Sequence, residues 1–354
     1  MNKLNPKVKG NVTIKDVALR AGVSPSTVGR VIGGYGYTSE KTRQRVLKAA
    51  KEINYHPHAI ARSLKTGKSC TIGYVVPSIT NPFFSHIAMG IQDITAIHNY
   101  NLILCNTAHD SDKTRSFIKM LMGSRVGGVI HSLPSGDETK HLVDSLHKLG
   151  IPVVVASGSG RLKYVDRVLS GRVQGALDST KYLLELGHTD IAVIAVKNST
   201  TSNLRLKGYR RALEEKGLRV DESLINEGLG YSEESGYAQM KILLAKSKCP
   251  TAVLAFNDLM AVGAIRAAEE EGLSIPQDLS LIGFDDTFAS LTRPQLTSVA
   301  LPMYEIGKVS AQILFDRVLK DDQEKPREII LSEKLIVRKS TAPPKDKNTG
   351  ISNS

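Results

Sequence analysis

Tryptophan is absent from this 354-residue sequence, and cysteine occurs three times, at Cys70, Cys105 and Cys249, with no Cys-x-x-Cys pair. This spacing excludes a zinc ribbon and a disulfide framework. No apolar run is long enough to cross a bilayer, and the basic N-terminus lacks the apolar stretch of a secretory signal. We therefore expect a cytoplasmic protein that has no metal site and does not associate with membranes.

Sequence motifs of common enzyme classes are also missing. There is no Gly-x-Gly-x-x-Gly after a strand pattern, no Gly-x-Ser-x-Gly elbow and no His-Glu-x-x-His. The nine histidines are scattered, and none has a partner at the spacing of a catalytic triad or a metal site. The sequence therefore predicts a binding protein without a cofactor rather than an enzyme.

Positive charge is concentrated in the first fifth of the chain. The net charge is +12, and residues 1–69 contain 14 Lys and Arg against 3 Asp and Glu. The remaining 285 residues are almost balanced, with 33 Lys and Arg against 32 Asp and Glu. A small basic module on a nearly neutral body indicates that the module binds a polyanion and that the body has another task.

The basic module carries the signals of a helix-turn-helix. Thr13 and Asp16 have the spacing of a capping box, and Gly22 ends the first stretch of helical periodicity. A second helix starts at once, because Ser24 can cap it and Pro25 suits its first position. Two short helices joined by a tight glycine turn form this motif.

A third amphipathic helix is predicted from Ser39 to about Ile53. Its apolar stripe would close a small core, and its other sides are basic. The predicted stripe comprises Val46, Leu47, Ala50 and Ile53, and the residues outside it include Lys41, Arg43, Arg45, Lys48 and Lys51.

In a helix-turn-helix the second helix enters the major groove of DNA, with its N-terminal residues at the base edges. Pro25, Ser26 and Arg30 are the candidates for base contacts, since an arginine can donate two parallel hydrogen bonds to guanine. Ser24 and Thr27 are candidates for phosphate contacts, which position a protein without reading sequence. Spacing alone leaves open that Arg30 is a surface residue of an ordinary three-helix bundle.

Two stretches of the module resemble a known protein family. VTIKDVALRAGVSPSTVGRVI at 12–32 and SEKTRQRVLKAAKEINYHPHAIARSLKTGKS at 39–69 are similar to the lactose/galactose repressor (LacI/GalR-type) family of bacterial transcription regulators. The similarity continues through the body to about residue 340. Two positions depart from the family: Gly29 and Gly33 stand where Ser and Asn are usual. Gly29 costs the second helix up to about 1 kcal/mol of propensity, which affects the strength and the site preference of DNA binding rather than its class.

The resemblance implies a DNA-binding headpiece at 12–56 and a hinge at 57–69 that folds on operator DNA. By position, Leu64 is the apolar wedge that enters the minor groove at the operator centre. Further DNA-contacting positions implied by the resemblance are Thr13, Tyr55, Ala61 and Lys65.

After residue 69 the pattern changes to short apolar strands that alternate with longer amphipathic stretches. This alternation is typical of parallel sheets with helices on both faces, and about 270 residues favour two such lobes over one open sheet. The resemblance implies a periplasmic-binding-protein-like domain at 70–340, with lobe crossings near 168 and 298. The predicted fold is therefore multi-domain: an all-α helix-turn-helix headpiece followed by a two-lobed α/β effector domain.

Ligands of open parallel sheets bind outside the carboxyl ends of the strands, which here means the cleft between the lobes. Phe83 and Phe84 would form a stacking wall, and the resemblance makes Arg205 the ligand-clamping arginine. Asp285 is the expected acceptor for ligand hydroxyl or amine groups. For any one of these side chains, core packing or helix capping stays an alternative. The full set of effector-binding candidates is Asn81, Phe83, Phe84, Ser157, Arg205, Tyr231, Phe256, Asn257 and Asp285.

Acidic residues that the family carries at two places are missing. Ser157 and Gly158 stand where the fourth strand usually ends in an acidic residue and Arg, and Ser170 and Gly171 replace Asp-Asn at the lobe crossing. Two acidic acceptors are lost while Arg205 remains, and charge-assisted hydrogen bonds to Arg are the strong ones. We therefore expect the effector to be a sugar phosphate or sugar acid rather than a neutral polyol.

One helix-turn-helix reads few base pairs, so specificity requires a dimer on a palindromic operator in double-stranded DNA. The resemblance implies a homodimer formed through the effector domain. Residues 341–354 are polar, contain no heptads and are predicted to be a disordered tail. Two alternatives stay open: the corepressor is a phosphoprotein, or the chain is a solute-binding module without a DNA function.

Overall fold

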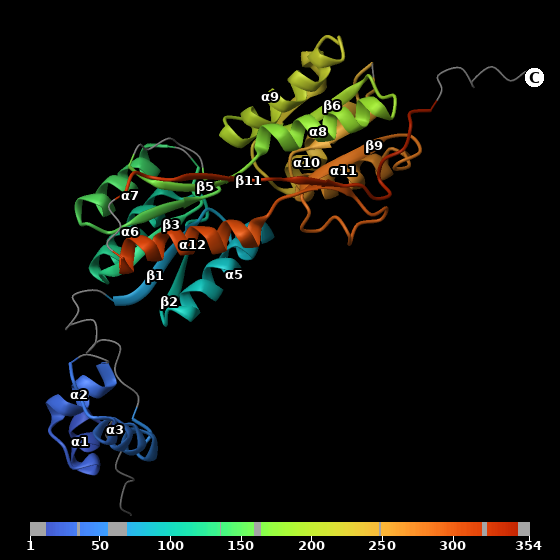
Figure 1. Cartoon of the computed structure of the whole chain (residues 1–354). Helices are drawn as coiled ribbons and strands as arrows, with labels where there is room; N and C mark the ends of the chain where they lie inside the picture. The colour runs from blue at the N-terminus through green and yellow to red at the C-terminus, as the bar shows by residue number, and fades with distance from the viewer. Residues whose placement is uncertain are drawn as a thin grey trace, which may run out of the picture. The chain divides into compact units, whose positions relative to one another are not determined.

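Three short helices at the N-terminus enclose a small apolar core. The computed structural model describes residues 12–33, 36–55, 69–134, 136–158, 164–247, 249–320 and 324–345. The chain divides into a headpiece and a body. The headpiece helices are α1 (Ile14–Ala21), α2 (Pro25–Gly33) and α3 (Glu40–Glu52), the blue elements of Figure 1. Val17, Val28 and Val46, one from each helix, are fully buried and hold the three together.

The first two helices begin and end at the capping residues. The backbone N–H and the hydroxyl of Thr13 both donate to the carboxylate of Asp16, at 2.8 and 2.7 Å. Gly22 ends α1 in the left-handed region, with φ of 61°. The hydroxyl oxygen of Ser24 accepts from the N–H of Thr27 at 3.2 Å and starts α2. The predicted helix-turn-helix is confirmed.

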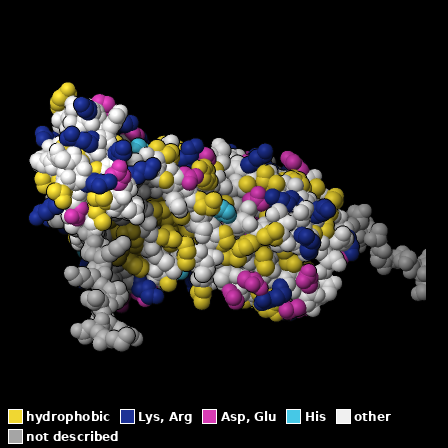
Figure 2. Space-filling model, turned by 90° about the horizontal axis from the view of Figure 1, so that it is seen from below, with side chains coloured by type: hydrophobic (Ala, Val, Ile, Leu, Met, Phe, Trp, Pro, Cys, Tyr) yellow, Lys and Arg dark blue, Asp and Glu magenta, His cyan; other side chains and the backbone are white. Residues whose placement is uncertain are grey.

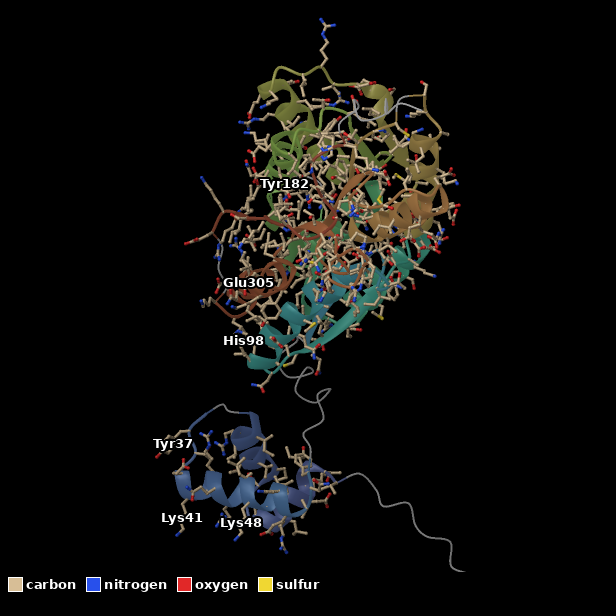
Figure 3. All side chains as sticks on the ribbon, turned by 90° about the vertical axis from the view of Figure 1, so that its right-hand side faces the viewer. Tyr37, Lys41, Lys48, His98, Tyr182 and Glu305 are labelled. Atoms are coloured by element: carbon tan, nitrogen blue, oxygen red, sulfur yellow. The ribbon has the colours of Figure 1, made fainter. Side chains whose placement is uncertain are left out.

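The core side of α3 differs from the predicted stripe at two residues, since Ala49 is buried and Leu47 is not. Val46 and Ala49, three positions apart, are buried on the same side, whereas Leu47 is 48% exposed. The prediction was wrong at Leu47, because α1 and α2 contact α3 along a narrower strip than the hydrophobic pattern indicates. Figure 3 shows Lys41 and Lys48 pointing away from α3 into solvent.

The body consists of two six-stranded sheets whose strand orders correspond. Their strand orders are β11-β5-β4-β3-β1-β2 and β12-β10-β9-β8-β6-β7. β11 joins β5 in parallel, whereas β12 joins β10 antiparallel. The first sheet comprises β1 (Ser69–Val76), β2 (Asn101–Asn106), β3 (Val126–His131), β4 (Val153–Ala156), β5 (Asp166–Ser170) and β11 (Glu328–Leu331). The second comprises β6 (Ile191–Val196), β7 (Ile225–Gly228), β8 (Ala252–Ala255), β9 (Ser280–Asp285), β10 (Thr297–Ala300) and β12 (Lys334–Ile336). This arrangement confirms the predicted α/β body.

Helices cover the sheets in closely packed pairs, and glycine permits the approach. A Cβ added at Gly307 would lie 2.0 Å from Ile87 O, where α12 crosses α5, the pair that runs side by side in Figure 1. A Cβ at Gly263 would lie 2.0 Å from Glu233 O, where α11 crosses α10. The helices near the first sheet are α5 (Pro82–Ile97), α6 (Ser111–Gly123), α7 (Asp137–Lys148) and α12 (Met303–Leu319). Those near the second are α8 (Arg172–Glu185), α9 (Thr200–Glu215), α10 (Glu233–Leu244) and α11 (Asp258–Glu270), with a short 3-10 turn, η1 (Glu222–Leu224).

Within the described residues the chain passes between the two sheets three times. It crosses after β5, after β10, and again between β11 and β12. The third crossing was not anticipated from the sequence, because β11 and β12 are strands of four and three residues. Strands of this length are too short to show an alternation of apolar and polar residues in the sequence.

Residues 341–345 pack against the second sheet, so the prediction that they belong to a disordered tail is wrong. Thr341 Oγ1 lies within hydrogen-bond distance of Tyr182 Oη and of Thr297 Oγ1, at 3.1 Å from each; Figure 3 labels Tyr182. The N–H of Ala342 donates to Ser280 Oγ at 3.0 Å. The polar composition that suggested disorder supplies hydrogen bonds to partners more than 40 positions away in the sequence. Residues 346–354 lie outside the described residues.

Candidate functional site

The five candidates on the second helix form one polar cluster at its N-terminus. Ser24 Oγ lies 2.8 Å from Ser26 Oγ and 2.9 Å from Thr27 Oγ1. Arg30 is exposed, and its Nη2 donates to Thr27 Oγ1 at 3.3 Å. Pro25 occupies the first helical position between them. Hydroxyls, a guanidinium and the N–H groups at a helix N-terminus are all hydrogen-bond donors. They can donate to DNA phosphates or base edges in place of their present partners.

The remaining headpiece candidates lie in different surroundings. Thr13 is exposed at the start of α1. Tyr55 is half-buried, packs against the headpiece core and donates its N–H to Ala50 O at 2.8 Å, so it has a structural role there. Ala61, Leu64 and Lys65 lie outside the described residues.

The headpiece surface is basic. All of its described Lys and Arg side chains are exposed. Figure 2 shows more Lys and Arg than acidic side chains on the headpiece, at the left of the view. Such a surface suits the phosphate backbone of a nucleic acid, to which it contributes salt-dependent affinity. The eight residues are Lys15, Arg20, Arg30, Lys41, Arg43, Arg45, Lys48 and Lys51.

A cavity of about 640 Å³ lies at the carboxyl ends of the strands of both sheets. For each strand from β1 to β10, at least one residue at its end or shortly after it lines the cavity. In each sheet the chain order reverses beside the first strand, at β1 and β3 and at β6 and β8, and the loops that diverge there leave a crevice. All nine predicted effector-binding candidates line this cavity.

The aromatic candidates contribute unequally. Phe83 and Phe84 meet edge to face at 5.0 Å, with ring planes at 89°. The hydroxyl of Tyr231 lies 2.7 Å from Ser199 Oγ. Phe256 is fully buried, with its ring 5.7 Å from that of Phe284, so most of it belongs to the core.

The two asparagines both cap helices. Asn81 Oδ1 accepts from the N–H of Phe83 at 3.0 Å and starts α5. Asn257 Oδ1 accepts from the N–H of Met260 at 2.8 Å and starts α11. The helix-capping alternative therefore holds for both, and Asn257 Nδ2 also donates to Tyr231 O at 3.4 Å.

Arg205 and Asp285 form an ion pair and both line the cavity. Arg205 Nη1 donates to Phe256 O, and its guanidinium carbon lies 4.2 Å above the ring of Phe284. Burial raises the pKa of the Asp285 carboxyl well above its usual range, although the charge of Arg205 opposes this. Asp285 also has a φ of 98°, which a non-glycine residue rarely adopts, and strained backbone of this kind clusters at ligand sites.

The loop that carries Asp285 is held by a buried carboxylate. Asp258, at the start of α11, accepts from the N–H of Thr287 at 2.7 Å and from Ser298 Oγ at 2.7 Å. Burial raises the pKa of Asp258 to about 6, against the effect of these hydrogen bonds. Asp258 therefore positions the segment after β9 without lining the cavity.

Arg172 is a lining residue that the sequence analysis missed. It is the first residue of α8, directly after the Ser170-Gly171 crossing, and it is 6% exposed. Its Nη2 donates to Ser157 O at 2.7 Å and to Gly158 O at 3.2 Å. The only signal in the sequence was a basic residue next to a crossing that already departs from the family pattern.

The described part of the chain contains no group of three or more His, Cys, Asp or Glu that could hold a metal ion. The helices in that part are all too short or too polar to span a bilayer. A helix-turn-helix with an exposed polar N-terminus, followed by a two-sheet body that contains a cavity, is the arrangement of a DNA-binding transcription regulator.

Comparison with known proteins gives the family. Residues 13–58 match the family described as Bacterial regulatory proteins, lacI family, and residues 180–341 match the Periplasmic binding protein-like domain. The chain is 39% identical over 307 residues to catabolite control protein A of Priestia megaterium, covering 86% of this chain and 92% of that protein. It is 39% identical over 335 residues to the HTH-type transcriptional repressor PurR of Vibrio cholerae serotype O1, covering 93% and 97%. The chain belongs to the lacI family of bacterial transcription regulators.

Solved structures agree with this assignment. The lac repressor dimer bound to operator and the anti-inducer ONPF superposes with a TM-score of 0.83 at 28% identity, covering 94% of this chain and 99% of that one. The complex of the transcriptional regulator CelR with cellobiose superposes with a TM-score of 0.70 at 31% identity, covering 93% and 100%.

Proposed function

We propose that the protein is a homodimeric repressor of a palindromic operator, controlled by a sugar or anionic sugar derivative that binds in the cavity. The observation that carries this proposal is that both sheets line one cavity. A ligand that contacts both lobes has different affinities for different lobe arrangements. It therefore shifts the population between them and, through the hinge, the spacing of the two headpieces.

The cavity and the structural neighbours support a small polar effector. A volume of about 640 Å³ falls within the range of small-molecule sites, which is roughly 300–1,000 Å³. The lining combines an aromatic pair, Phe83 and Phe84, with polar groups at strand ends, which suits a molecule with a flat apolar face and hydroxyls. One neighbour was solved with cellobiose and another with bound ribose.

The headpiece is proposed to dock its α2 N-terminus in the major groove, with Arg30 at a base edge and Ser24 and Thr27 at phosphates. Leu64 is proposed as the minor-groove wedge, flanked by Ala61 and Lys65, on the strength of the family pattern. Thr13 and Tyr55 complete the proposed contact set.

Dimerisation is proposed to occur through the lobe of the first sheet. Met89 and Ile97 on α5 are 57% and 71% exposed, and Leu104 on β2 is 39% exposed. Figure 2 shows hydrophobic side chains gathered on the body between charged ones. An exposed patch of apolar side chains is typical of a surface that another protein chain covers, and we propose that a second copy covers this one.

Selection of random duplex DNA by the purified full-length protein, at fixed and stated salt, tests this function. We expect enrichment of a palindrome with a pyrimidine–purine step at its centre, since such steps kink easily. A metabolite mixture should change the amount of DNA retained. Failure to enrich any palindrome, with or without metabolites, would leave the solute-binding alternative. Enrichment that requires a phosphoprotein fraction would support the phosphoprotein alternative.

A further inference from the structure

Arg172 lines the cavity and links the two sheets of the body. Its helix, α8, lies near the second sheet, but its side chain bonds to the backbone at the end of β4 in the first sheet. A Cβ added at Gly158 would lie 2.7 Å from Val155 Cγ1 and 3.0 Å from Leu133 O. Because no side chain fits at residue 158, Arg172 supplies the charge at this strand end.

Two of the three guanidinium nitrogens of Arg172 donate no hydrogen bond to a described residue. Its hydrogen bonds to described residues all use Nη2, to Ser157 O, Gly158 O and, at 3.4 Å, Ser157 Oγ. Within the described chain Nε and Nη1 have no hydrogen-bond partner, although the residue is 6% exposed and lines the cavity. Carbonyl oxygens satisfy hydrogen-bond donors but do not neutralise a buried cation, so the site favours a ligand that brings negative charge.

The guanidinium of Arg205, a residue that is 2% exposed, lines the same cavity as that of Arg172. Burial and the charge of Arg205 lower the pKa of Arg172 to about 10, so Arg172 is protonated at neutral pH. Asp285 offsets Arg205 incompletely, because burial raises the pKa of its carboxyl. Glu333, at the third crossing, acts on Arg172 through its charge, but its carboxylate oxygens have no hydrogen-bond partner among the described residues.

We infer that Arg172 and Arg205 together bind one oxyanion of the effector, and that the effector is a phosphorylated or carboxylated sugar rather than a neutral one. Lys197 and Thr200 line the same cavity, the latter at the first position of α9. A lysine and a helix N-terminus add positive potential on the Arg205 side. This inference rests on the proposed effector-binding function.

Titration calorimetry of the full-length protein with matched ligand pairs tests the inference. The probes are ribose and ribose 5-phosphate, glucose, gluconate and glucose 6-phosphate, with inorganic phosphate and sulfate as bare anions. At least one anionic probe should bind about tenfold or more tightly than its neutral partner, since charge-assisted hydrogen bonds to arginine are stronger than neutral ones. Preference for the phosphate ester over the carboxylate would assign the site to a dianion.

Variants at two residues separate charge from packing. Arg172→Gln should remove most of the anion preference, and Arg172→Lys should retain part of it. Ser157→Asp places a carboxylate beside Arg172, whereas Ser157→Asn has the same size without the charge. Both suit the φ of 56° at residue 157, a region in which Asp and Asn are enriched. The Asp variant should bind the anionic probes about tenfold more weakly than the Asn variant.

Equal binding of neutral and anionic partners would overturn the inference, as would binding of no anionic probe at all. An anion preference that survives both Arg172→Gln and Ser157→Asp would also overturn it. The DNA selection is independent of these titrations. Anion binding without operator enrichment would remove the proposed repressor function alone, and operator enrichment without anion preference would remove this inference alone.

Discussion

Arg205 and Asp285 form a buried ion pair in which Arg205 Nη2 lies 3.8 Å from Asp285 Oδ1, with the side chains 3% and 8% exposed. The distance is too long for a hydrogen bond, so the pair attracts electrostatically while both groups keep hydrogen-bonding capacity for a ligand. The ring of Phe284 beneath the guanidinium holds it in place. The pair is thus arranged for binding more than for stability.

Replacing Arg205 should separate its role in effector binding from its role in stability. Arg205→Gln leaves the Asp285 carboxyl buried without its counter-charge, so we expect a loss of about 3 kcal/mol in unfolding free energy and at least about tenfold in effector affinity. Adding Asp285→Asn should restore much of the stability and none of the affinity. Urea unfolding and calorimetry of the single and double variants measure both. Full recovery of affinity in the double variant would contradict the assigned roles.

Two headpiece substitutions should have different signatures on DNA. Arg30→Ala should cost about 1–3 kcal/mol and relax preference at one position of each half-site. Lys48→Ala, at an exposed site on α3, should weaken binding to all sequences alike and lower the salt slope by about 1. Binding isotherms on the selected operator and its single-base variants, at several salt concentrations, measure both effects.

Arg20 offers a matched control for these headpiece variants. It lies on α1, and its Nη2 is 2.8 Å from the carboxylate of Glu52 at the exposed surface. Arg20→Ala removes the same charge as Arg30→Ala without altering the α2 cluster. Relaxed base preference in the Arg20 variant would show that the assigned docking of α2 is wrong.

Close helix packing at Gly307 should make that position intolerant of alanine. A Cβ there would lie 2.0 Å from Ile87 O in the neighbouring helix, which forces α5 and α12 apart. We expect Gly307→Ala to lower the unfolding free energy by about 1–3 kcal/mol. Gly123→Ala, with nothing within 4 Å of the added Cβ, is the matched control and should be neutral within about 0.5 kcal/mol. Thermal or urea unfolding compares the two, and equal effects would contradict the packing argument.

Asp258 should make the body more stable toward mildly acidic pH. Its pKa is about 6 in the folded chain and 3.8 as the ordinary value, so the folded state holds the extra proton between these values. The contribution, about 3 kcal/mol, is fully present below pH 3.8 and is lost as the pH rises through about 6. Asp258→Asn keeps an acceptor for Thr287 and should flatten this part of the pH profile of unfolding. An unchanged slope between pH 4 and 6 would contradict the role of Asp258.

Much of the cavity could be predicted because its residues follow strands. Asn257 and Asp285 come just after or at the end of an apolar strand and Asn81 follows β1 within a few residues, and parallel strands bring such positions to one edge. Arg205 instead lies within α9, and the family resemblance pointed to it. Which face each side chain presents could not be predicted. Phe256 turned into the core, since its neighbour Phe284 packs against it across adjacent strands.

The sequence by itself determined the local elements of this protein: the caps of α1 and α2, the alternation of strand and helix, and the charge of the headpiece. These depend on neighbours within a few positions. The tertiary structure alone decided the place of Arg172, the return of β11 and β12 to different sheets, and the hydrogen bonding of Thr341. Each of these depends on partners brought together by the crossings between the sheets. Arg172 bonds to residues 14 and 15 positions earlier, and Thr341 to one 44 positions earlier, so no local pattern records them.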